Sequence, residues 1–161
     1  MKYLPNTKTC VVTEVFLGLF CLVCGCAIYL LFRSRTLNLY QWCEAIGLSD
    51  VIDTLREHVQ NWSISEFIKF SLPDGLYSAA YIFIIDAIWH VGNPPTKYII
   101  ILFVPFVAIA NEILQFFGFA KGTFDIYDLV CYALPLLIYI TIKLLNNNTF
   151  TQLKHIRLWK K

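Results

Sequence analysis

Charged residues are scarce in this sequence. Asp, Glu, Lys and Arg make up 15% of its 161 residues, against about 25% in a typical soluble domain. Hydrophobic residues make up 58%, and the mean hydropathy is +0.61, whereas soluble domains are about 45–50% apolar. A soluble globule of this size cannot cover so much apolar surface, and a lipid bilayer removes the need to. The composition therefore predicts an integral membrane protein, with a single domain over residues 1–161.

The residue patterns of metal sites, disulfide frameworks and catalytic sets are also missing. Cys21 and Cys24 form a CxxC, which in a soluble loop suggests zinc or redox chemistry. They lie in the most apolar run of the chain, with no second CxxC or histidine pair, so we interpret them as small apolar residues of a membrane helix. Ser78 lies two turns from Asp86, too far for a direct hydrogen bond. The sequence thus predicts no enzyme, no metal and no cofactor.

Four apolar segments predict transmembrane helices. The first, residues 11–32, contains 18 residues without a charge, Val15–Phe32, which is about the minimum for a span. Its apolar run is longer than that of a typical signal peptide, and no small-x-small cleavage site precedes Arg33, so we expect it to be retained. The other spans are expected at residues 73–91, 98–117 and 125–145. The predicted fold is all-α and polytopic, with four transmembrane helices.

Two segments outside these spans have their own character. Residues 33–71 are mixed in composition, and we expect two or three short helices there. One of these is amphipathic, because Val51, Ile52, Leu55 and Val59 recur at helical spacing. It is expected to lie on the membrane or to cap the bundle. The basic tail, residues 146–161, is predicted to anchor at the surface of anionic lipid.

Four spans place both termini on the same side of the membrane. With the termini inside, eight Lys and Arg residues fall in inner segments and five in outer segments. The positive-inside rule therefore favours cytoplasmic termini. We predict a multi-pass protein of the cell membrane, the inner membrane of a bacterium.

Polar residues inside the spans need an explanation, because each ionisable one costs about 2.5–3.5 kcal/mol on insertion scales. Asp86 lies in the middle of the second span, with His90 one turn later. They are either a proton-sensitive pair or a structural hydrogen bond between helices. Asn111, Glu112 and Gln115 share one face of the third span, which we expect to face the bundle interior.

Asp125 and Asp128 open the fourth span. Thr123 can cap this helix, and an acid in its first turn offsets the helix dipole. That explanation suits Asp125, whereas Asp128 lies nearly one turn deeper. Because the link between the third and fourth spans is short, we expect Glu112 and Gln115 to approach both aspartates. The predicted intramembrane polar cluster comprises Asp86, His90, Asn111, Glu112, Gln115, Asp125 and Asp128.

Part of this pattern resembles a known family. Glu112-Ile113-Leu114-Gln115 followed by Thr123-Phe124-Asp125-Ile126-Tyr127-Asp128 is similar to the signature of VanZ-like membrane proteins. That signature reads approximately Glu-x-x-Gln, then Arg-Thr-Phe-Asp-x-x-Asp, then Asn and Gly. The match covers about 25 residues of the 161; the Arg position is Gly122, and the Asn and Gly positions are Tyr132 and Pro135. The resemblance implies a four-span fold and a polar cluster of Glu112, Gln115, Asp125 and Asp128, in a family linked to resistance to the glycopeptide teicoplanin.

Two functions of different classes follow. The first is a VanZ-like envelope protein whose buried acidic cluster binds a polar or cationic group, such as that of a lipid-linked cell-wall precursor. The second is a homo-oligomeric channel or membrane-disrupting effector gated by a small ligand, as in prokaryotic antiphage defence, with a ring of carboxylates lining its pore. In that case the ligand or gating region is expected around Arg33, Arg35, Arg56 and Lys69. The lipid bilayer is the expected partner in both cases, and direct binding of nucleic acid is not expected.

Overall fold

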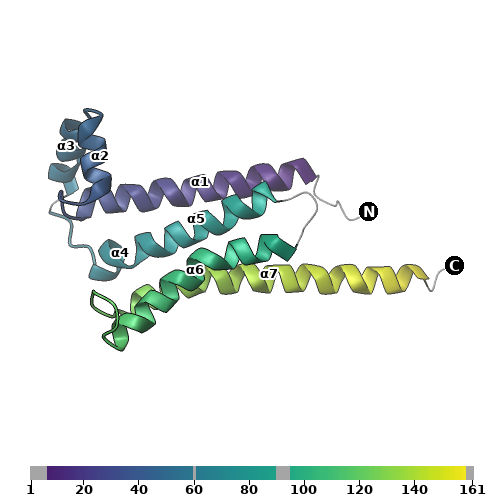
Figure 1. The fold of residues 1–161 in the computed structure, drawn as a ribbon. Helices are drawn as coiled ribbons and strands as arrows, with labels where there is room; N and C mark the ends of the chain where they lie inside the picture. The colour runs from purple at the N-terminus through teal and green to yellow at the C-terminus, as the bar shows by residue number, and fades with distance from the viewer. Residues whose placement is uncertain (1–6, 60, 90–94, 159–161) are drawn as a thin grey trace.

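The structure is a computed structural model that describes residues 7–59, 61–89 and 95–158, with side chains for 11–59, 61–89 and 95–145. The described residues form seven α-helices and no strand (Figure 1). Their bounds are α1 Thr7–Phe32, α2 Asn38–Ala45, α3 Ser49–Val59, α4 Glu66–Phe70, α5 Leu72–Ile88, α6 Pro95–Phe116 and α7 Ile126–Leu158. The all-α prediction is thus confirmed for the described residues, as are the three short helices between residues 33 and 71.

Three of these helices are long and apolar enough to cross a membrane, and not four as predicted. They cover Val11–Phe32, Pro95–Phe116 and Ile126–Leu145. The second predicted span is shorter than expected, because α5 has 17 residues and ends at Ile88. Such a helix is about 26 Å long, whereas the hydrocarbon core of a bilayer is about 30 Å thick. Helix α5 therefore differs from the three candidate spans in its length.

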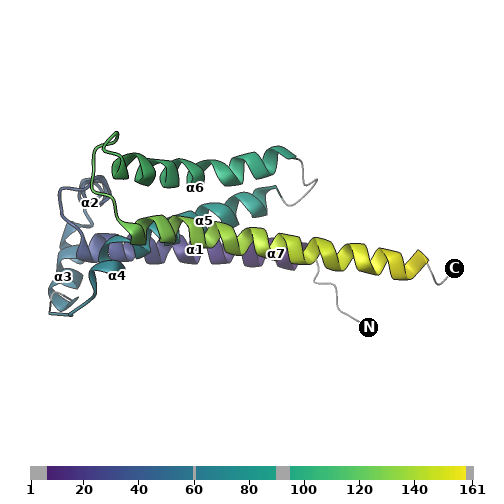
Figure 2. The ribbon, with the colours of Figure 1, turned by 90° about the horizontal axis from the view of Figure 1, so that it is seen from below.

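The four longer helices run back and forth along one axis (Figure 1). The beginning of α1 and the end of α7 lie at one end of the bundle, which we call the terminal end, and α2 to α4 lie at the opposite end, which we call the cap end. Helix α5 packs against α1, α6, α7 and α4, and Figure 2 shows it alongside α1 and α7. The shortest of the four is therefore the centre of the bundle. The tail prediction lies partly outside the described residues, and α7 continues to Leu158.

Glycines allow close packing at the helix contacts. A Cβ added at Gly18 of α1 would lie 2.7 Å from Ile84 Cγ1, and one at Gly25 would lie 3.1 Å from Tyr77. Gly75 of α5 faces Cys131 of α7, whose Cβ and carbonyl oxygen would both be 3.2 Å from an added Cβ. Small residues of this kind let membrane helices approach closely, and dispersion contacts then hold them together.

Helices α2 and α3 form a cap that is tied to the end of α1 by Arg56. Its Nε donates to the carbonyl of Leu30 at 2.6 Å, and its Nη2 donates to that of Arg33 at 2.8 Å. The last carbonyls of a helix have no partner within the helix, so Arg56 completes the C-terminus of α1. Within the cap, Tyr40 donates to the Asp53 carboxylate at 3.0 Å. Desolvation and this hydrogen bond raise the pKa of Tyr40.

Candidate functional site

The terminal end holds a buried ion cluster centred on Asp86 of α5. Its carboxylate lies 2.5 Å from Nζ of Lys97 and 2.8 Å from Nζ of Lys143. Tyr139 also donates to it at 2.8 Å. Asp86 and Lys97 are 3% and 2% exposed. A buried charge is tolerated only when it is paired and hydrogen-bonded, and this carboxylate meets both conditions.

The side chains of this cluster come from three helices. Asp86 lies in the last turn of α5, Lys97 in the first turn of α6, and Lys143 in α7. Lys97 also donates to the carbonyl oxygens of Asp86 and Trp89, each at 3.3 Å. These carbonyls belong to the C-terminal end of α5, where a cation is favoured by the helix dipole. The cluster therefore joins α5, α6 and α7 at one level.

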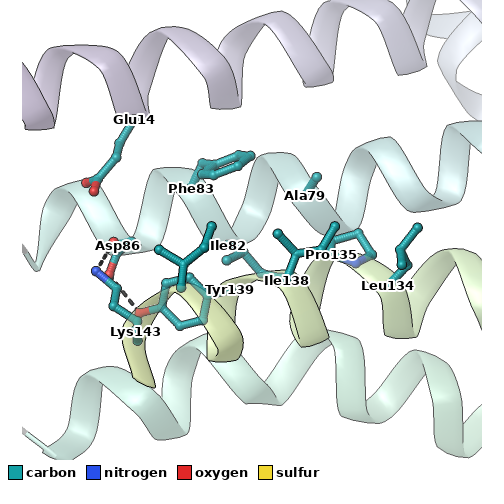
Figure 3. A pocket seen from close by; sticks show the side chains of 11 residues that line it. Glu14, Ala79, Ile82, Phe83, Asp86, Leu134, Pro135, Ile138, Tyr139 and Lys143 are labelled. Atoms are coloured by element: carbon teal, nitrogen blue, oxygen red, sulfur yellow. Dashed lines mark hydrogen bonds and ion pairs between the residues drawn. The ribbon is translucent and has the colours of Figure 1, made fainter. Parts of the chain in front are cut away.

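An apolar cavity of about 510 Å³ begins beside this cluster. Its residues come mainly from α5 and α7, and α1 contributes Glu14 (Figure 3). Glu14, Asp86 and Lys143 lie together at one end of the cavity, and aliphatic and aromatic side chains line the rest. The cavity thus has one polar end, at the terminal end of the bundle.

The cap end holds an acidic cluster from α5, α6 and α7. Glu112 of α6 is 6% exposed, and its Oε2 accepts a hydrogen bond from the backbone N–H of Asp125 at 3.4 Å. Asp128 Oδ1 is buried and has no hydrogen-bond partner among the described residues. Asp74, at the start of α5, lies within electrostatic range of Asp128, Glu112 and Arg33. One described arginine therefore faces four carboxylates.

Asp125 also begins α7. Its Oδ1 accepts a hydrogen bond from the N–H of Tyr127 at 2.8 Å, and its carbonyl accepts the N–H of Leu129. These are the contacts of an N-cap residue. The prediction that Thr123 caps this helix is therefore wrong, because the helix begins three residues after Thr123, at Ile126.

The link between α6 and α7 folds back onto Gln115. Gly122 has a φ of +134°, a conformation that glycine adopts at little cost. A Cβ at this position would lie 2.8 Å from Cδ of Gln115. Gln115 thus packs over Gly122, the position that aligns with the arginine of the VanZ-like signature, and a larger side chain there would displace Gln115 and strain the backbone.

A polar cavity of about 420 Å³ opens beside the acidic cluster. Arg33, which directly follows α1, lines this cavity and donates to the carbonyls of Phe70 at 2.8 Å and Lys69 at 3.5 Å. The lining residues are Arg33, Glu66, Phe67, Phe70, Thr123, Asp125, Tyr127 and Asp128.

The structure divides the residues of the predicted intramembrane cluster between the two ends. Glu112, Gln115, Asp125 and Asp128 lie together at the cap end, whereas Asp86 lies at the terminal end beside Lys97. Glu112 lies fifteen positions after Lys97 along α6, which corresponds to about 22 Å. Asn111 is exposed. His90 lies outside the described residues.

The basic residues expected in a ligand or gating region make structural contacts. Arg33 and Arg56 bind backbone carbonyls at the ends of α4 and α1. Arg35 forms an ion pair with Asp53 at 3.1 Å, with 61% of the Arg35 side chain exposed. Lys69 is half-buried, and its carbonyl accepts a hydrogen bond from Arg33.

Sequence reasoning missed Lys97, Lys143 and Asp74. Lys97 falls just outside the third span expected from the sequence, which begins at residue 98, whereas α6 begins at Pro95. Pro at the first helical position is a signal that would have moved this boundary. Lys143 lies four residues after Tyr139, a spacing that places two side chains on one helix face. Both bind the same carboxylate.

Metal binding has no support in the described part of the chain. No group of three or more His, Cys, Asp or Glu residues there is arranged to hold a metal ion.

Comparisons with known protein families, with curated proteins and with solved structures find no match to this chain.

Proposed function

We propose that this chain is a multi-pass envelope protein, related to VanZ-like proteins, that binds a cationic or amine-bearing group in its acidic cavity. The observation that carries the proposal is the buried Oδ1 of Asp128, which has no hydrogen-bond partner among the described residues. A buried carboxylate oxygen costs free energy unless a donor reaches it. A bound ammonium or guanidinium group supplies such a donor.

The charge around Asp128 favours a positively charged ligand. Asp74, Glu112 and Asp125 lie near it, and Arg33 is the described cation that acts on the same group of acids. Like charges at close range repel, and a ligand cation relieves that repulsion. Phe67 and Tyr127, whose rings meet edge to face at 5.7 Å, line the same cavity. The site therefore suits a group with a cationic head and an apolar part, such as that of a lipid-linked cell-wall precursor.

The proposal includes a fourth membrane crossing by α5. The helix is enclosed by α1, α6 and α7, and it contains two acidic residues, Asp74 near its start and Asp86 near its end. Between them lie eleven residues without a charge. A helix that is sheltered by longer neighbours can cross a membrane at a length that would be marginal alone, because a short span is matched by local thinning of the bilayer. We place the terminal end in the cytoplasm of a bacterial cell, where Lys97 and Lys143 follow the positive-inside rule.

The test is teicoplanin susceptibility of bacteria that express the chain. Expression is expected to raise the minimum inhibitory concentration, and Asp128→Asn and Glu112→Gln are expected to abolish the increase. Asp50→Asn, on the exposed face of the cap, is the matched control and keeps the phenotype. Membrane levels of all variants are measured with an epitope tag. An unchanged inhibitory concentration on expression, or full activity of both cluster variants, contradicts the proposal.

The oligomeric channel ranks second because none of the carboxylates expected in its ring, Asp86, Glu112 or Asp128, is exposed at the surface of the protomer. Asp86 is paired with two lysines inside the bundle, and Glu112 is buried against the start of α7. A ring of carboxylates in a pore must face the central axis of the oligomer. Conductance in planar bilayers would reverse this ranking.

A further inference from the structure

The apolar cavity at the terminal end is a groove that opens to the side of the bundle. Its floor is formed by Ala79, Ile82 and Phe83 of α5, and its wall by α7. On that wall, Leu134 and Ile138 are 53% and 50% exposed, so the groove is open where the bundle faces lipid. Its volume of about 510 Å³ is within the range of small-molecule sites, about 300–1,000 Å³. An occupant can enter it directly from the bilayer.

The groove has the polarity of a lipid. The α7 residues that line it extend from Leu134 to Lys143, a distance of about 14 Å along the helix. Over most of that length the lining is aliphatic or aromatic, and the charged residues are confined to the terminal end (Figure 3). An acyl chain lying along α7 would have its polar head at the level of those charges. The groove follows the helix axes, as the chain of a bilayer lipid does.

The charges at the polar end suit a zwitterionic head group. Lys143 approaches from α7 with 33% of its side chain exposed, and Glu14 points to the same end from α1 (Figure 3). A phosphate can accept hydrogen bonds from the Lys143 ammonium, and a primary ammonium can donate to the Glu14 carboxylate. A purely anionic head group would meet Glu14 at close range, which disfavours it.

We propose that this groove binds one acyl chain of a zwitterionic phospholipid, with its phosphate at Lys143 and its ammonium at Glu14. The site is separate from the acidic cavity of the proposed function, at the opposite end of the bundle. The result for lipid binding is therefore independent of the teicoplanin phenotype.

Native mass spectrometry of the full chain, released from detergent with added dioleoyl phosphatidylethanolamine or phosphatidylglycerol, tests the proposal. One phosphatidylethanolamine is expected to stay bound per chain, in preference to phosphatidylglycerol. Leu134→Trp fills the groove and is expected to weaken retention by about tenfold or more, which corresponds to about 1.4 kcal/mol. Leu137→Trp is the matched control, because Leu137 is on the same helix and 58% exposed but does not line the groove. It is expected to retain the lipid.

A second pair of variants keeps the result interpretable. Ile138→Phe fills the groove with a smaller change in volume and is expected to reduce retention as well. Glu14→Gln is expected to remove the preference for phosphatidylethanolamine while a lipid is still retained. No retained lipid in the parent chain, equal retention by Leu134→Trp and Leu137→Trp, or equal binding of the two lipids overturns the proposal. A dimer that Leu134→Trp separates, with no lipid bound, also overturns it and assigns the groove to a second copy of the chain.

Discussion

The Asp86 carboxylate of α5 lies 2.5 Å from the ammonium group of Lys97 in α6, and both side chains are almost fully buried. The two residues are 11 positions apart in the sequence. Lys143 of α7 binds the other carboxylate oxygen. The Asp86 carboxylate is therefore the shared counter-charge of both lysines.

Asp86→Asn is expected to destabilise the bundle by about 3–5 kcal/mol, because it leaves the buried Lys97 without its counter-charge. Thermal unfolding in detergent, followed by helical circular dichroism, measures the effect. The double variant Asp86→Asn/Lys97→Met removes both buried charges and is expected to recover part of the loss. Equal melting of Asp86→Asn and the parent chain would contradict the importance of the pair.

Arg56→Ala is expected to loosen the cap from the bundle, because Arg56 donates hydrogen bonds to the carbonyl of Leu30 in the last turn of α1 and to that of Arg33 just after it. Hydrogen exchange should become faster in residues 38–59, while α6 and α7 remain protected. Arg35→Ala is the control. It breaks an exposed ion pair with Asp53 and is expected to change stability by less than about 1 kcal/mol. Similar exchange in both variants would show that Arg56 does not hold the cap.

Asp125→Ala removes the N-cap of α7 and is expected to cost about 1 kcal/mol. Asp125→Asn keeps an oxygen for the N–H of Tyr127 and is expected to retain most of that stability. Comparing the two separates the capping role from the charge. If only the charge matters, the two variants will unfold at the same temperature.

Gly18→Val is expected to separate α1 from α5, since an added Cβ already lies 2.7 Å from Ile84. Overpacking of this kind costs about 1–3 kcal/mol. Ala27→Val makes a similar addition on the exposed face of the same helix, so its melting temperature should match that of the parent chain. Crosslinking between cysteines placed in α1 and α5 provides an independent measure of the contact.

The crossing by α5 is tested through the side of the membrane on which the termini lie. With four crossings, reporters fused at residue 1 and residue 161 report the same side, and a reporter inserted after Lys121 reports the opposite side. With three crossings the two termini lie on opposite sides. Alkaline phosphatase and green fluorescent protein fusions distinguish these arrangements.

The sequence predicts the helices of this protein better than their contacts. The span at residues 11–32 matches the apolar part of α1, because a long run without charges is a local property. The pairing of Glu112 with the start of α7 also follows from sequence, since a short link makes neighbouring helices antiparallel. Both predictions depend on residues that are close together in the chain.

The ion cluster around Asp86 could not be predicted from residues that are close together in the sequence. Asp86 and Lys143 are 57 residues apart, and the hydrophobic pattern gives no information about which helix faces meet. Four-residue spacing led instead to His90 as the expected partner of Asp86. The order in which the helices pack around α5 decides which charges are neighbours, and that order is a tertiary property.

The ion pair between Asp86 and Lys97 has a consequence for biogenesis. A nascent α5 that entered the bilayer alone would carry an unpaired carboxylate, at a cost of about 2.5–3.5 kcal/mol on insertion scales. Lys97 follows 11 residues later in the sequence and can neutralise Asp86 as soon as α6 is available. If α5 crosses the membrane as proposed, insertion of α5 and α6 together as one hairpin would avoid that cost, and Lys143 would complete the cluster once α7 joins them.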